Sequence, residues 1–110
     1  MTDTCFDVHT DGELTVCNHG TVMVNGNLLG VIRAADGGYE MYHPFKNVEP
    51  ITVDTLKDVL EEDQLLLNLG DRIGIPADHP KRKKIVERTE DANRVIKAIE
   101  SFAAWHTTQN

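Results

Sequence analysis

The chain of 110 residues lacks several features that would each point to a particular function. It has one serine, Ser101, outside any nucleophile-elbow motif, and it has neither a P-loop nor a G-x-G-x-x-G fingerprint. No apolar run approaches the ~20 residues of a membrane span, and the N-terminus has neither the basic nor the apolar part of a secretory signal. The sequence therefore predicts a cytoplasmic protein that does not cross a membrane, is not an enzyme and binds no cofactor.

Cysteine is also scarce, and both copies lie in the stretch "TCFDVHTDGELTVCNH". Two cysteines in a reducing compartment predict free thiols rather than a disulfide. His9 and His19 lie in the same stretch, so a zinc site is an alternative. On a strand, however, Cys5 and His9 would be roughly 13 Å apart. Cys5, Cys17 and His19 can converge, but they supply three ligands without an evident fourth, so the sequence predicts no metal site.

Acidic and basic residues are unevenly distributed along the chain. Through Pro80 there are four Lys and Arg against fourteen Asp and Glu, a net of −10, and from Lys81 onward seven against four, a net of +3. An acidic body with a basic segment argues against nucleic-acid binding by the whole surface, but it leaves a local contact open.

The N-terminal part of the chain predicts an antiparallel β-meander within a single domain, residues 1–110. Turn signals separate short β-branched and aromatic runs over residues 4–45, which gives four or five strands. In the first hairpin, a three-residue loop at 10–12 would place Cys5 opposite Cys17 and gather the apolar side chains on the other face. A second hairpin is expected around Asn25-Gly26-Asn27.

Two helices are predicted after the meander, which makes the fold class α+β. The first begins after the candidate N-cap Thr52 and spans about 53–63, with an acidic ridge on the face away from its apolar side chains. The ridge consists of Asp54, Asp58, Glu61 and Glu62. Leu65 and Leu69 would fall on this acidic side if the helix continued, so either it ends near Asp63 or these leucines cover something else.

The second helix is expected over about 79–105, with a break near Thr89 as an alternative. It begins with a basic cluster, which is Lys81, Arg82, Lys83 and Lys84. Cations are disfavoured at a helix N-terminus. Pairing with the acidic helix, within one chain or between two, would offset this cost, and contact with phosphate is the alternative.

The segments "GTVMVNGNLLGVIRAADGGYEMYHP" and "ITVDTLKDVLEE" together resemble a pattern of small uncharacterised phage and mobile-element proteins. In that group a β-meander precedes a threonine-capped acidic helix, and the resemblance covers about residues 20–62. It implies a meander-plus-helix domain and carries over no catalytic residue.

Taken with the missing catalytic motifs, this resemblance predicts a non-enzymatic accessory protein of phage or mobile-element origin. It would inhibit or modulate a host protein, such as a nucleic-acid-handling one, through the acidic ridge. One alternative is a small nucleic-acid-associated regulator that uses the basic cluster. Another is a structural or assembly subunit, such as a homodimer, that associates through the last helix and the leucine run, which consists of Leu65, Leu66, Leu67 and Leu69.

Overall fold

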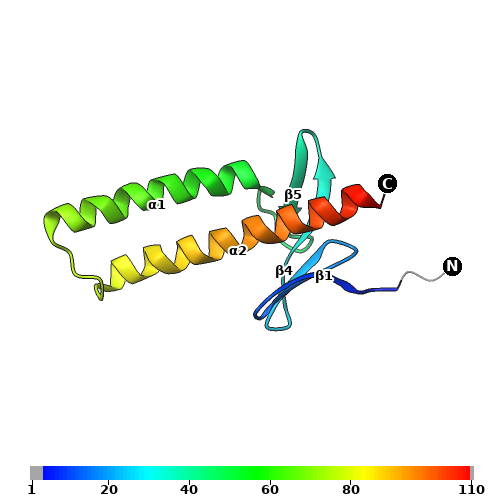
Figure 1. Ribbon diagram of the computed structural model, residues 1–110, viewed down its shortest axis with the longest axis horizontal. Coiled ribbons are helices and arrows are strands. Elements are labelled where there is room, and N and C mark those ends of the chain that lie inside the picture. Colours follow the sequence, from blue (N-terminus) through cyan, green and yellow to red (C-terminus); the bar gives the residue numbers. More distant parts are fainter. Residues whose placement is uncertain (1–3, 110) are drawn as a thin grey trace.

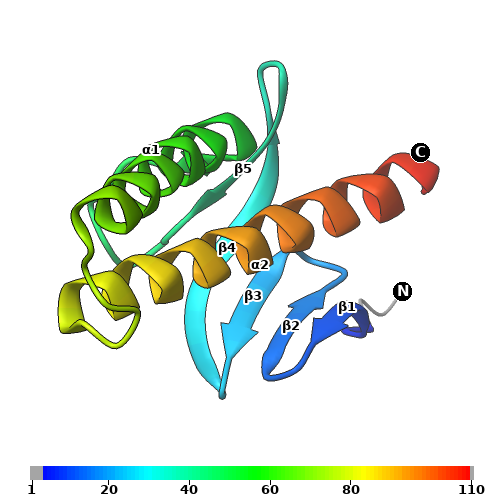
Figure 2. The same cartoon turned by 60° about the vertical axis from the view of Figure 1, so that its left-hand side comes forward.

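The computed structural model describes residues 4–109, which form an antiparallel six-stranded sheet and two long helices (Figures 1 and 2). The predicted α+β meander is confirmed, and it has six strands where four or five were predicted. The strands are β1 (Asp7–Asp11), β2 (Leu14–Cys17), β3 (Thr21–Val24), β4 (Asn27–Ala35), β5 (Gly38–Tyr42) and β6 (Ile51–Thr52). The helices are α1 (Val53–Ile73) and α2 (Pro80–Thr108).

Each strand of the sheet pairs with the next one along the chain, in the order β1 to β6. The β3–β4 turn is the predicted one: Asn25 and Gly26 have φ values of 54° and 78° and connect Val24 to Asn27. Such left-handed pairs match the twist of a two-residue hairpin. The additional strand β6 pairs Ile51 with Met41 directly before α1 begins.

The predicted register of the first hairpin is wrong. The chain turns through Gly12 and Glu13, so Asp11 lies opposite Leu14, and Asp7 rather than Cys5 lies opposite Cys17. The register shifts between Asp7 and His9, which marks a β-bulge. A bulge inserts one extra residue and interrupts the strict alternation from which the register was predicted.

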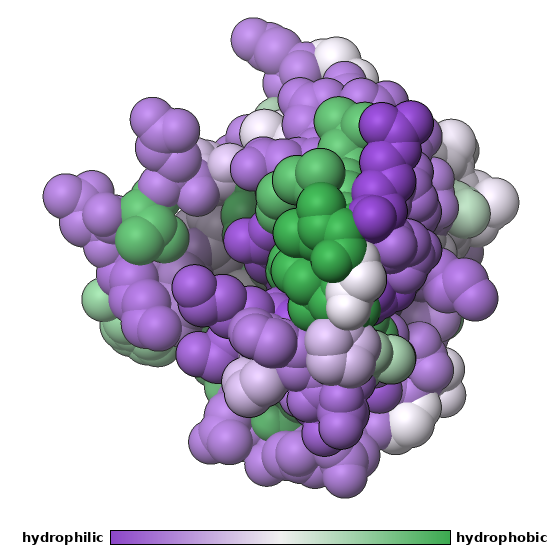
Figure 3. Space-filling model, turned by 90° about the vertical axis from the view of Figure 1, so that its left-hand side faces the viewer, coloured by the Kyte–Doolittle hydropathy of each residue, from purple (hydrophilic) through white to green (hydrophobic). Residues whose placement is uncertain are grey.

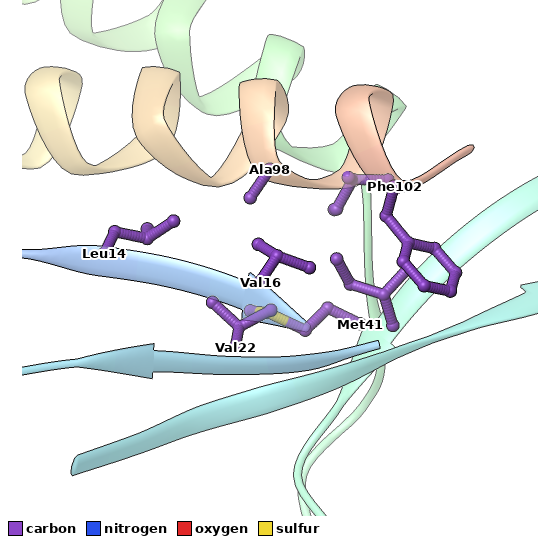
Figure 4. Close-up of a cluster of buried hydrophobic side chains, with 8 residues drawn as sticks. Leu14, Val16, Val22, Met41, Ala98 and Phe102 are labelled. Atoms are coloured by element: carbon purple, nitrogen blue, oxygen red, sulfur yellow. The ribbon is translucent and has the colours of Figure 1, made fainter. Parts of the chain in front are cut away.

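The hydrophobic core lies between the sheet and α2, which crosses one face of the sheet (Figures 2 and 4). In Figure 4, Val16 and Val22 point from the strands toward Ala98 and Phe102 on the helix. These helical residues belong to a stripe at intervals of three or four positions, which is the period of one helix face. The buried core residues are Leu14, Val16, Val22, Ile32, Met41, Ala98, Ile99 and Phe102.

Helix α1 begins where the sequence predicts and ends ten residues later than predicted, at Ile73 instead of 63. Thr52 caps it: its Oγ1 accepts a hydrogen bond from the Thr55 backbone N–H at 3.2 Å, and Thr55 Oγ1 accepts one from the Thr52 N–H at 2.9 Å. No glycine or proline occurs until Gly70, and the intervening residues favour helix. Leu65 and Leu69 therefore belong to the helix, and the alternative that it ends near Asp63 is wrong.

Helix α2 is continuous through Thr89 and ends at Thr108, three residues beyond the predicted boundary. His79 is its N-cap rather than its first residue, and its Nδ1 accepts a hydrogen bond from the Lys81 backbone N–H at 3.2 Å. Pro80 occupies the first turn, where its missing N–H costs nothing.

Candidate functional site

The two helices form an antiparallel pair whose far end extends beyond the sheet (Figure 1). The sheet packs on the C-terminal half of α2, where the core residues of this helix lie, from Ala92 to Phe102. The molecule measures 60 × 29 × 28 Å along its principal axes, and its length comes from this helical pair. We call the projecting part, residues 63–91, the arm.

The interior of the arm is polar at its base, next to the part that the sheet covers. The Asp63 side chain is fully buried between the helices and accepts hydrogen bonds from the Arg88 guanidinium, including one from Nε at 3.1 Å. Thr89 Oγ1 donates a further hydrogen bond to the same carboxylate at 3.3 Å. The hydrogen bonds from Arg88 hold the pKa of Asp63 below its ordinary value, although burial acts in the opposite direction.

A second ion pair closes the tip of the arm. Arg82 pairs with Asp71 and also donates a hydrogen bond to the Ile75 carbonyl at 2.8 Å. This arginine therefore connects the start of α2 to the end of α1 and to the loop between them.

The outer face of α1, which points away from α2, changes character along its length. Its first half carries the predicted acidic ridge, and all four carboxylate residues are exposed. Its second half carries the apolar residues Leu65, Leu66, Leu69 and Ile73, with exposed fractions of 69%, 40%, 53% and 65%. Leu65 and Leu69 line a depression together with Asn68 and Arg72. We call these four apolar residues the leucine face.

Figure 3 views the molecule from the free end of the arm and shows a hydrophobic patch bordered by hydrophilic residues. The alternative that the leucines cover something else fits this arrangement, because the core of their own chain does not bury them. A contiguous exposed apolar patch of this kind marks an interaction surface in many proteins.

The structure separates the acidic ridge from the basic cluster within one chain. Asp58 lies fifteen residues before the end of α1 at Ile73, which corresponds to about 22 Å at ~1.5 Å per residue. No ridge carboxylate forms an ion pair within residues 4–109. Of the basic cluster, Arg82 is partly buried by its contacts with Asp71 and Ile75, whereas Lys81, Lys83 and Lys84 are exposed. Phosphate contact through these lysines stays a prediction.

The first hairpin brings Cys5, Cys17 and His19 together, and His9 is not part of this group. One sulfur or nitrogen atom from each of the three residues lies within 4.8 Å of the others. Both cysteines are free thiols. The buried Nε2 of His9 has no hydrogen-bond partner among the described residues. The three-ligand convergence considered from the sequence is thus the arrangement found, although the register from which it was considered is wrong.

The burial of Asp63 was not predicted from the sequence, and the leucine face was predicted only in part. Asp63 occupies a position of the apolar stripe of α1, four residues after Val59 and three after Leu60. A single acidic residue on such a stripe signals a buried partner, which is Arg88 here. The helical period places Leu65 and Leu69 on the acidic side, as expected for a helix that continues, and the structure adds two more exposed apolar residues to this face.

Comparisons of the chain with protein-family models, curated proteins and solved structures gave no match. Neither of the two helices is long and apolar enough to cross a membrane in the part of the chain that the structure describes. The functional interpretation therefore rests on the surfaces of this chain.

Proposed function

We propose that the protein is a non-enzymatic binding module that assembles through its arm, with the arm of a second copy as the occupant of the leucine face. The observation that supports this proposal is the order in which acidic, apolar and basic surfaces follow one another along the arm. On α1 an acidic half is followed by an apolar half and then by Arg72, and the exposed lysines of the basic cluster lie at the same end of the arm, in the first turns of α2.

Such a surface is complementary to itself when two copies meet in antiparallel orientation. A two-fold axis near Leu67 would place Leu65 of one copy against Leu69 of the other. The same register places Glu62 of one copy against Arg72 of the other, twice by symmetry. The leucines of the two leucine faces then cover each other, Ile73 lies outside this contact, and each acidic ridge runs toward the basic tip of the second copy. A parallel arrangement would instead place the two acidic ridges together, which is unfavourable.

The energies are compatible with a reversible dimer. Fully burying a leucine or isoleucine side chain stabilises by about 1.5–3 kcal/mol. Six such side chains, the three leucines of each leucine face, have on average a little more than half of their surface to lose and contribute about 5–10 kcal/mol. Association costs about 4–15 kcal/mol in lost freedom of motion. The apolar contact alone therefore supports a weak or moderate dimer, and the charge pairs decide its orientation and strength.

Sedimentation of the full chain over a range of concentrations tests this proposal. Glu62→Arg should weaken dimerisation about tenfold, because an exposed pair contributes ~0.2–1 kcal/mol and symmetry creates two pairs that become repulsive. Arg72→Glu should do the same, and the double variant should restore the dimer. Lys57→Glu, an exposed charge reversal on another side of α1, is the matched control. A chain that remains monomeric at every concentration, or a double variant no stronger than the singles, contradicts the proposed pairing.

A second candidate function rests on the exposed, unpaired ridge carboxylates described above. Carboxylates one helical turn apart rise ~5.4 Å, which is similar to the spacing of phosphates along a nucleic-acid strand. The ridge could thus dock on a basic groove of a host protein, as an inhibitor or modulator. The combined variant Asp54→Asn, Asp58→Asn, Glu61→Gln should then lose partner binding at low salt and keep its fold. Unchanged binding would leave the ridge as a solvated surface. The phage or mobile-element origin and the cytoplasmic location stay predictions.

A further inference from the structure

Hydrogen bonds hold the segment before β1 beside the turn that follows β2. Asn18 provides three hydrogen bonds for this: Oδ1 accepts from the Phe6 N–H at 3.0 Å, Nδ2 donates to the Thr4 carbonyl at 2.9 Å, and its backbone N–H donates to the Phe6 carbonyl at 2.8 Å. The Phe6 ring also packs edge-on against Trp105, with ring centroids 5.8 Å apart. Cys5 lies between the two fastened residues, so its backbone position is fixed on both sides.

The turn after β2 presents the other two side chains. The Gly20 N–H donates to the Cys17 carbonyl at 2.9 Å, which closes a turn that contains Asn18 and His19. The His19 backbone N–H points at the Cys17 sulfur, 3.4 Å away. Gly20 ends the turn with φ of 89°, and a Cβ there would lie 2.2 Å from the Ile32 carbonyl oxygen. The turn is therefore locked against β4 in the conformation that points Cys17 and His19 toward Cys5.

The surroundings of the two thiols shift their pKa values in opposite directions. Burial acts to raise the pKa of Cys17, but hydrogen bonds from the backbone N–H groups of His19 and Thr21 outweigh it, and the pKa is lowered. Cys5 has a raised pKa, chiefly because its thiol hydrogen-bonds to Cys17, and the charge of Asp7 adds to the effect.

We propose that Cys5, Cys17 and His19 bind one divalent zinc-class ion, with the fourth coordination position open to water or to a group from a partner. Two thiolates and one imidazole are ligands that zinc prefers, whereas magnesium and calcium prefer oxygen. Ligand atoms on a tetrahedral zinc lie roughly 3.3–3.8 Å apart, so atoms within 4.8 Å of one another need to move by about 1 Å. Rotation of the exposed Cys5 and His19 side chains supplies this movement.

Binding releases the thiol protons, because each cysteine coordinates as a thiolate while the histidine coordinates in its neutral form. No bond between the sulfurs forms and no oxidant is required. The proposal does not depend on self-association, because the site lies at the sheet and the leucine face lies on the arm.

Titration of the full-length chain with zinc and cobalt(II), in the presence of a non-thiol reductant, tests the site. We expect one ion per chain. Cobalt should give the visible bands of tetrahedral coordination and a sulfur-to-metal charge-transfer band in the near ultraviolet. Failure of the reduced chain to take up zinc, including a chain that forms only a Cys5–Cys17 disulfide without reductant, overturns the proposal.

Single substitutions test which residues are ligands and whether Asn18 positions Cys5. Cys5→Ser carries the test, because Cys5 is exposed and outside the core, and it should weaken zinc binding more than 100-fold with an unchanged circular dichroism spectrum. His19→Ala should do the same. Asn18→Ala should weaken binding about 10–100-fold, since it positions Cys5 without touching the ion. His9→Gln is the control on the same hairpin and should bind zinc normally. Equal binding by Cys5→Ser and the parent chain would overturn the site.

Discussion

The ion pair inside the arm predicts an asymmetry between its two members. Asp63 is fully buried, whereas the Arg88 side chain is 53% exposed. Replacing Arg88 with methionine leaves a carboxylate without its counter-charge between two helices. Removing one partner of a buried pair costs about 3–5 kcal/mol. Because Thr89 still donates to the carboxylate and Arg88 shields it only partly from water, we expect Arg88→Met to cost about 3 kcal/mol.

The reverse substitution should have a much smaller effect. In Asp63→Leu, the arginine can turn into solvent, and the leucine joins the apolar stripe of α1. Exchange of a buried charged group for an apolar one of similar size is often neutral or stabilising by about 1–4 kcal/mol. The double variant Asp63→Leu, Arg88→Met should therefore be close to the parent chain in stability.

Urea unfolding, followed by circular dichroism at one low protein concentration, measures these differences without a contribution from dimerisation. Arg94→Met is the matched control, because it removes an exposed arginine from the same helix and should change stability by less than about 0.5 kcal/mol. If Arg88→Met costs less than Asp63→Leu, the carboxylate is not buried in the way that the structure places it.

Three further outcomes are expected. The free energy of unfolding should decrease as the pH falls below about 4, which urea unfolding at several pH values would show. The pKa of Asp63 is lowered in the folded state. Its stabilising contribution is therefore present above its ordinary pKa and is lost as the pH drops through the folded value. Gly20→Ala should destabilise by more than about 2 kcal/mol in the same assay, because of its positive φ and the Ile32 carbonyl, and a cost below 1 kcal/mol would contradict this close approach. In the absence of metal, Cys17→Ser should lower the midpoint temperature of thermal unfolding, because a hydroxyl group replaces a buried sulfur. Cys5→Ser should leave the midpoint unchanged, because Cys5 is exposed. Equal midpoints for the two variants would contradict the burial of Cys17.

The sequence predicts the local features of this fold well, and its failures share a physical cause. The Asn25-Gly26 turn and the Thr52 cap are confirmed because a few adjacent residues determine each of them. The first hairpin fails because a bulge near His9 interrupts the alternation. Helix α1 was predicted too short because Leu65 and Leu69 would otherwise fall on its acidic side, outside the apolar stripe. The helix does continue and both leucines are exposed on that side, and a periodic pattern does not say what covers such a face.

The candidate sites depended even more on contacts between distant segments. The acidic ridge could be derived from helical periodicity alone, and the structure keeps it on one exposed face. The pairing of Asp63 with Arg88 joins residues 25 positions apart, and its partner could not be identified before the antiparallel packing of the helices was known. The convergence of Cys5, Cys17 and His19 was considered from the strand pairing, but the hydrogen bonds of Asn18 that hold Cys5 in place follow from no strand pattern.

The two edges of the sheet have a consequence for aggregation. One edge is β1, which is kinked by the bulge between Asp7 and His9, and the other is β6, which contains only Ile51 and Thr52. An exposed edge strand recruits further strands when it offers a long, regular row of free N–H and C=O groups. Neither edge offers such a row, so growth into fibrils by strand addition is disfavoured. A deletion that straightened β1 would remove this protection and should make the chain prone to amyloid-like assembly.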